Sequence, residues 1–143
     1  MNPLLNASHL FIWPVRVYYE DTDSGGVVYY ANYLRFLERA RTEWLRVKGF
    51  EQTHLMTYHH VIFVVRKVQI DYLSPARFND TLSITVQVDA VSRTTIEFAQ
   101  SVVGERECAR ARVKVACVDA VTFRPARIPN ELVQTMESCQ NGH

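Results

Sequence analysis

The sequence predicts an α+β domain of two layers, in which one long helix lies on a face of an antiparallel sheet of about five strands. Two patterns carry this prediction: apolar residues at helical spacing in one segment, and apolar–polar alternation in several others that are separated by turn residues. The length of 143 residues suits one domain. We therefore expect a single domain over residues 1–143, with residues 1–12 and 131–143 as flexible or peripheral ends.

The first elements in chain order are a short strand and an acidic loop. Residues 15–19 predict a strand, and residues 20–26, EDTDSGG, are rich in turn-forming residues.

The long helix is predicted over residues 31–48. Apolar residues recur there at helical spacing, namely Tyr33, Leu34, Leu37, Ala40, Trp44, Leu45 and Val47. The charged residues Arg35, Glu38, Arg39, Arg41, Glu43 and Arg46 are expected on the opposite face. Asn32 is the expected cap at the start, and Gly49 is the expected stop.

The other strands follow the helix. Residues 61–73, 82–89, 94–103 and 109–117 are rich in β-branched and aromatic residues or alternate between apolar and polar. Turn signals separate them, such as Ser74-Pro75 and Asn79-Asp80. Because short turns join consecutive strands, we expect an antiparallel sheet.

Composition and charge exclude several classes of protein. Hydrophobic residues make up 48% and charged residues 22% of the chain, and the net charge is +1, so neither global disorder nor nucleic-acid binding is expected. No apolar run is long enough to cross a membrane, and no Lys or Arg precedes Arg16, so we expect no signal peptide and no membrane insertion. The three widely spaced cysteines, Cys108, Cys117 and Cys139, indicate a reducing compartment, and we expect a cytoplasmic location.

The acidic loop before the helix is the best candidate for chemistry. A helix N-terminus presents unpaired N–H groups, and Gly25 and Gly26 let a bound carbonyl approach the backbone. Asp23, just before them, is a carboxylate that could attack an acyl carbon or draw a proton from water. The same residues also fit an ordinary turn and helix cap, and these patterns alone do not decide between the two interpretations.

Two long motifs resemble one known family. Residues 17–45, VYYEDTDSGGVVYYANYLRFLERARTEWL, and residues 63–82, FVVRKVQIDYLSPARFNDTL, resemble the 4-hydroxybenzoyl-CoA thioesterase group, and most closely its Tol-Pal-associated, YbgC-type branch. The resemblance covers roughly residues 13–129. It implies the hotdog fold, a long helix wrapped by a curved antiparallel sheet, in homodimers or homotetramers. It also implies hydrolysis of acyl-CoA thioesters.

The resemblance implies specific site residues. Asp23 holds the place of the catalytic carboxylate, which Glu20 and Asp21 do not. Gly26, Val27 and Tyr30 are the residues expected to orient the thioester and hold its carbonyl oxygen. Many relatives have His where this chain has Tyr30, so the acyl preference stays open; its hydroxyl can donate a hydrogen bond, or the ring can simply pack. Tyr29 and Tyr33 could line an acyl pocket. No cofactor is expected, because CoA is part of the substrate.

Basic residues are candidates for the phosphates of CoA. Arg66, Lys67, Arg77 and Arg112 are the expected contacts, in part across a subunit boundary. Arg110, Arg112 and Lys114 are predicted to share one face of a strand, which is also typical of a solvated surface.

Other functions remain as alternatives. Hotdog hydratases usually pair His with an acid, and no His lies between Asp21 and Lys48. A non-catalytic module that binds acyl-CoA or acyl-carrier protein is the third possibility, and acyl-carrier protein could also deliver the substrate. His59 and His60 are neighbours that would point to opposite faces of a strand, and we expect no metal.

Overall fold

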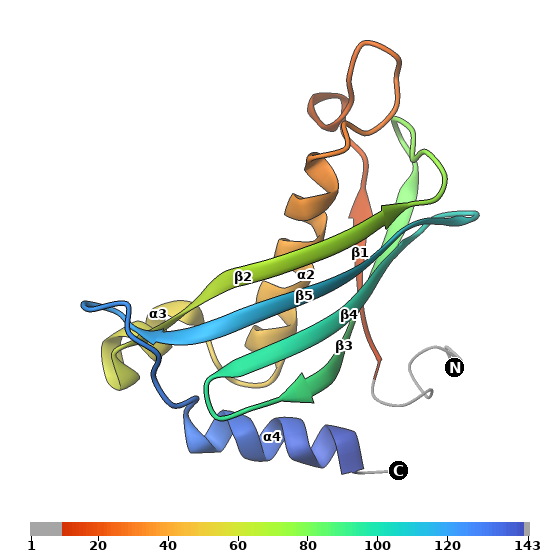
Figure 1. Cartoon of the computed structure of the whole chain (residues 1–143). Coiled ribbons are helices and arrows are strands. Elements are labelled where there is room, and N and C mark those ends of the chain that lie inside the picture. The colour runs from red at the N-terminus through yellow and green to blue at the C-terminus, as the bar shows by residue number, and fades with distance from the viewer. Residues whose placement is uncertain (1–9, 142–143) are drawn as a thin grey trace.

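A curved antiparallel sheet wraps around one long helix in the computed structural model, which describes residues 10–141, with side chains to residue 136 (Figure 1). The strands are β1 (Phe11–Arg16), β2 (Val61–Tyr72), β3 (Thr81–Val91), β4 (Thr95–Val103) and β5 (Glu107–Asp119). The helical elements are η1 (Tyr19–Asp21), α2 (Asn32–Val47), α3 (Gln52–His54), η2 (Leu55–His59) and α4 (Asn130–Asn141). This confirms the predicted α+β architecture of the hotdog fold.

The sheet has the strand order β1-β3-β4-β5-β2, and all neighbouring strands are antiparallel. The short turns at 92–94 and 104–106 join strands that pair, as expected. The turn after β2 does not, because β2 pairs with β5 at the far side of the sheet. The chain instead crosses over through residues 73–80, and this loop lies beside the acidic loop before α2 (Figure 1).

Helix α2 provides one half of the core. Its buried apolar residues Tyr33, Phe36, Leu37, Ala40, Trp44 and Leu45 face the sheet, where Leu82, Ile84, Val86, Ile96, Phe98, Val113 and Val115 are also buried. Leu34 and Val47 are exposed, so the apolar face is narrower than predicted.

The end of α2 follows the prediction. Gly49 has φ +93°, its N–H donates to the carbonyl of Arg46 at 3.0 Å, and the N–H of Phe50 donates to that of Leu45 at 3.0 Å. This is a Schellman motif, in which glycine supplies the left-handed residue.

The start of α2 differs from the prediction, because Ala31 and not Asn32 is the N-cap. The Asn32 side chain is buried and donates instead to Asp21.

The ends of the chain also differ from expectation. The first strand spans Phe11–Arg16 rather than residues 15–19, and it pairs with β3 from Phe11↔Val86 to Arg16↔Thr81. Pro14 is tolerated because β1 is an edge strand. At the other end α4 lies beside the end of the sheet where β3 turns into β4 (Figure 1). Leu132 and Met136 of this helix are fully buried. The start of the predicted C-terminal end, residues 131–136, is therefore packed against the domain. Residues 1–9 and 142–143 lie outside the described residues.

Candidate active site

The acidic loop forms a small hairpin between η1 and α2. Thr22 and Val28 form an antiparallel bridge, the N–H of Asp23 donates to the carbonyl of Val27 at 2.9 Å, and the N–H of Gly26 donates to that of Asp23 at 3.1 Å. Gly26 has φ +78°, a left-handed conformation that glycine adopts without strain. A second bridge, Val27↔Arg77, attaches this hairpin to the crossover loop. The local hydrogen bonds therefore define one position for Asp23.

Asp23 is the carboxylate of the hairpin itself. Its side chain is exposed, and its Oδ1 accepts one hydrogen bond, from the N–H of Gly25 at 2.8 Å. This contact orients the carboxylate and leaves Oδ2 open to water or substrate.

Asp21 has the opposite environment. It is 7% exposed, its Oδ2 accepts from the N–H of Tyr18 at 2.9 Å, and its Oδ1 accepts from Nδ2 of Asn32 at 2.9 Å. A carboxylate with both oxygens bound to protein donors is not available to attack a substrate. Glu20 is exposed, but it lies in η1, outside the hairpin.

Backbone donors for a carbonyl oxygen occur where the loop meets the helix. In the part of the chain that the structure describes, the N–H groups of Val27, Tyr30 and Ala31 form no hydrogen bond. The N–H of Gly26 donates to Asp23, so Gly26 shapes the turn and is not a free donor here. Ala31, which the sequence reasoning missed, could have been found from the rule that the first N–H groups of a helix lack partners.

Tyrosine rings pack against Tyr30, which carries one of these donors. The ring centroids of Tyr29 and Tyr30 lie 4.8 Å apart, those of Tyr30 and Tyr72 6.2 Å apart, and the hydroxyl of Tyr72 donates to the carbonyl of Tyr30 at 3.1 Å. Tyr29 and Tyr30 are exposed, whereas Tyr33 is buried and its hydroxyl accepts from the N–H of Ala76. Burial raises the pKa of Tyr33 and Tyr72, so both phenols stay protonated at neutral pH. Of the two tyrosines expected to line an acyl pocket, only Tyr29 has an open face.

The four basic residues predicted to bind CoA are not gathered in one place. Arg77 lies beside the Asp23 hairpin and lines a polar hollow of about 370 Å³ with Arg106. Arg66 and Lys67 are exposed at a bulge in the middle of β2. Arg112 lies on the sheet face opposite α2, where it forms an ion pair with Asp89. Of these four residues, Arg77 is the one that a backbone bridge attaches to the hairpin of the candidate carboxylate.

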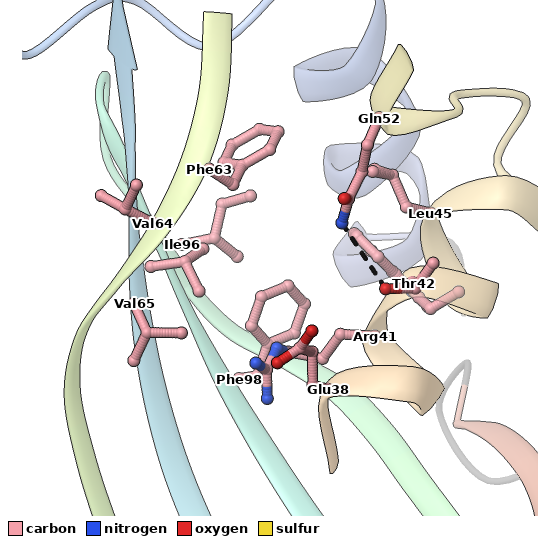
Figure 2. A pocket seen from close by; sticks show the side chains of 12 residues that line it. Glu38, Arg41, Thr42, Leu45, Gln52, Phe63, Val64, Val65, Ile96 and Phe98 are labelled. Atoms are coloured by element: carbon pink, nitrogen blue, oxygen red, sulfur yellow. Dashed lines mark hydrogen bonds between the residues drawn. The ribbon is translucent and has the colours of Figure 1, made fainter. Parts of the chain in front are cut away.

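A cavity of about 340 Å³ lies between α2 and the sheet (Figure 2). Its walls include Leu45, Phe63, Val65, Ile96 and Phe98, and none of the predicted site residues lines it. It lies along the C-terminal half of α2, away from the hairpin that precedes the helix.

Arg41 enters this cavity, although the sequence placed it on the outer face of the helix. Its Nη1 donates to Oε1 of Gln100 at 3.0 Å, and Nε2 of Gln100, a fully buried residue, donates to the carbonyl of Leu37 at 3.1 Å. Figure 2 shows Arg41 and Glu38 together at the cavity end near Phe98. Burial lowers the pKa of Arg41 to about 10, which leaves it charged at neutral pH. The polar partner on β4 could not be identified from the helical pattern.

The histidines do not form a metal site within residues 10–136, where no group of three or more His, Cys, Asp and Glu could hold an ion. His59 lies in η2 rather than on a strand, and its Nε2 is 3.8 Å from Oε2 of Glu131. Among the described residues, no helix is long and apolar enough to span a membrane.

Comparison with known proteins identifies relatives over most of the chain. The family model of the thioesterase-like superfamily matches residues 17–136. The acyl-CoA thioester hydrolase YbgC of Escherichia coli O6:H1 is 47% identical over 126 residues, which cover 87% of this chain and 93% of the relative. The acyl-CoA thioesterase YbgC of Haemophilus influenzae is 46% identical over 123 residues, covering 85% and 90% of the two chains.

A solved structure shows the same fold. The crystal structure of a probable thioesterase from Bartonella henselae superposes with a TM-score of 0.80 at 34% identity and covers 84% of this chain and 99% of its own.

Proposed function

This chain belongs to the thioesterase-like superfamily, and from that membership we infer that it is an acyl-CoA thioester hydrolase, which converts an acyl-CoA and water to a free acid and CoA. One structural observation supports Asp23 as the catalytic residue: its carboxylate is exposed and has an open oxygen, in a hairpin that precedes unpaired N–H groups at the start of α2. Asp21, the neighbouring acid, is fully engaged in the protein.

The reaction needs a nucleophile or base at the acyl carbon and charge stabilisation at the carbonyl oxygen. Asp23 supplies the first, either by attacking the carbon itself or by taking a proton from the attacking water. When Asp23 acts as the base, the carbon–sulfur bond breaks as the tetrahedral intermediate collapses, and the leaving thiolate takes the proton that Asp23 removed from water. When Asp23 attacks directly, the bond breaks as an anhydride with Asp23 forms, water hydrolyses that anhydride and restores the carboxylate, and the thiolate takes a proton released by that water. The N–H groups of Tyr30 and Ala31, with that of Val27, are the donors we assign to the developing oxyanion.

We propose that the functional unit is at least a homodimer formed through β2. This strand is an edge of the sheet and has twelve residues, and its Val65 and Val68 are 49% and 38% exposed. The other edge, β1, has six residues and contains Pro14, which cannot donate to a partner strand. A second β2 placed antiparallel to the first would continue the sheet and cover this edge.

Such a dimer would join two separated features of the chain. Antiparallel pairing brings the Tyr72 end of one β2 beside the Val61 end of the other. Tyr72 contacts Tyr30 next to the Asp23 hairpin, and Phe63 lines the cavity beside α2. We therefore propose that the cavity of one copy receives the acyl group that Asp23 of the other copy hydrolyses. Tetramers would add contacts beyond this pair.

The remaining assignments concern CoA and location. We propose that Arg66, Lys67 and Arg77 contact the CoA phosphates, because they are exposed and form no ion pair among the described residues. Arg112 is a weaker candidate, since Asp89 already neutralises it. The free cysteines Cys108 and Cys117 fit a cytoplasmic enzyme. Acyl-carrier protein remains an alternative carrier of the acyl group.

A substrate panel tests the proposed function. The purified protein is incubated with short, long, branched and aromatic acyl-CoAs, and the released thiol is followed with a chromogenic disulfide. We expect at least one substrate to be hydrolysed at a rate that is lost in the Asp23→Asn variant. Binding of acyl-CoA without thiol release across the panel would instead indicate a binding module.

A further inference from the structure

The buried pair Asp21–Asn32 has no part in the proposed chemistry, yet both carboxylate oxygens of Asp21 accept hydrogen bonds beside the site. Asp21 is the one buried acidic residue in the part of the chain whose side chains are described, and no ion pair compensates its charge there. Burial of a carboxylate is unfavourable unless donors surround it. Here the donors are the N–H of Tyr18 and Nδ2 of Asn32, each at 2.9 Å.

The same residue connects three segments. Through its side chain Asp21 is bonded to Tyr18, where the chain leaves β1, and to Asn32, the first residue of α2. Through its carbonyl it accepts from the N–H of Tyr29 at 3.0 Å, next to the free donor Tyr30. The loop of residues 22–31 is thus closed at its base by Asp21, and both Asp23 and the unpaired N–H groups lie within that closed loop.

We propose that Asp21 and Asn32 form a positioning pair that sets the distance between the Asp23 carboxylate and the N–H groups at the start of α2. This inference rests on the proposed function. A misplacement of about 1 Å between a catalytic group and its partners can reduce a rate by about a hundredfold. Loss of the pair should therefore lower kcat more than it changes KM, because the acyl and CoA contacts lie elsewhere.

A double-mutant cycle separates positioning from general stability. Asn32→Asp places two carboxylates in contact, and we expect kcat to fall by ~10-fold or more while KM changes by less than ~3-fold. In the double variant Asp21→Asn/Asn32→Asp the new amide can accept from Tyr18 and donate to the new carboxylate, so the hydrogen bonds are restored with exchanged partners. We expect kcat to return to within ~3-fold of the wild type. Asn130→Asp, the same change at the exposed first residue of α4, is the matched control and should leave kcat unchanged.

A readout without turnover accompanies the kinetics. Amide hydrogen exchange should become faster in residues 22–31 of Asn32→Asp, return to the wild-type pattern in the double variant, and stay unchanged in β4 and β5. If Asn32→Asp does not fold, Asn32→Ala removes the donor without adding a charge, and we expect the same direction of change. The proposal is overturned if the folded single variant keeps wild-type kcat and exchange. It is also overturned if Asn32→Asp lowers kcat by the same factor in the wild-type background as in the Asp21→Asn background. Absence of wild-type thiol release would count against the proposed function, and the exchange data would still decide whether the pair holds the loop.

Discussion

Asp21 and Asp23 are separated by one residue, and their surroundings differ in kind. Asp21 is buried with both oxygens bound to protein donors, whereas Asp23 is exposed and binds one N–H. Because the side chain of Asp23 is exposed, a substrate can reach its carboxylate, and the hydrogen bond from the N–H of Gly25 limits the motion of that carboxylate. Two identical side chains thus have opposite environments: Asp21 is bound within the protein, and Asp23 is open to solvent.

The first prediction at this scale is that Asp23→Asn lowers kcat by ~10² or more, because the change removes the charge, the nucleophile and the base. The fold should persist, since Asn can accept the hydrogen bond from Gly25 as Asp does. Thiol release and circular dichroism measure the two properties. Glu20→Gln, which removes the same charge at an exposed position of η1, is the control and should retain kcat within ~3-fold of the wild type. A folded Asp23→Asn enzyme with the wild-type rate would refute the assignment.

The second prediction concerns the phosphates of CoA. Replacing Arg66 and Lys67 together with Ala should raise KM by ~10-fold while kcat stays nearly constant, because contacts remote from the thioester supply uniform binding. Arg77→Ala should act in the same direction. Arg110→Ala, an exposed residue that is paired with Glu107 on the outer sheet face, is the control. Light scattering must show the same assembly for each variant, and an unchanged KM for all of them would place the phosphates elsewhere.

At the scale of elements, both ends of α2 depend on single residues. The N-terminal end is attached to the loop through Asn32, and the C-terminal end is formed by the left-handed Gly49. A residue with a Cβ at φ +93° is strained, whereas the space around Gly49 is open, so the penalty there is conformational.

Gly49→Ala should therefore lower the free energy of unfolding by ~1–2 kcal/mol. Gly49→Asn should lose less, because Asn tolerates the left-handed conformation better than Ala. Chemical denaturation at a fixed protein concentration measures both variants. Equal stability of the wild type and Gly49→Ala would mean that the end of the helix relaxes to another conformation.

The fold was predictable wherever the signal was local. The apolar spacing over α2, its glycine stop and the alternation over β3 and β5 are properties of short segments, and the structure confirms the helix, its stop and the two strands that they predict. The shift of β1 and the burial of α4 were not predictable in this way. Pro14 weakens the strand pattern of β1, and the position of that strand depends on its pairing with β3. In α4, Leu132 and Met136 are too few to show helical periodicity, and the burial of this helix depends on its contacts with β3.

The candidate site shows the same division. The position of Asp23 came from a long motif, whereas the roles of its neighbours depended on tertiary partners. Asn32 fits a cap by residue type, but Asp21 binds its side chain. Arg41 fits the charged face of α2, but Gln100 on β4 draws it inward. Gly26 was expected to donate to the substrate, but the turn itself uses its N–H.

At the scale of the whole molecule, the uncovered edge of the sheet is the dominant feature. β2 is twice as long as β1, it carries exposed valines, and one side of its backbone faces no strand among the described residues. Exposed edges of this length are usually covered or charged in stable proteins. Pairing of β2 between two copies would provide that cover.

The last prediction tests this assembly. Val68→Lys places a cation at a partly exposed position of the edge strand β2, on the same sheet face as Val113, and a two-fold axis would bring it near its own copy, so the change should weaken the dimer. Light scattering over a range of concentrations should show a monomer for this variant at a concentration where the wild type is a dimer or larger. Val121→Lys makes the same change at a valine that is 84% exposed after β5, and it should leave the assembly unchanged. If the cavity of one copy serves Asp23 of the other, hydrolysis by Val68→Lys should fall with dilution, in step with the loss of dimer. A monomeric wild type at micromolar concentration would contradict the assembly, and a monomeric Val68→Lys with full activity would show that each chain holds a complete site.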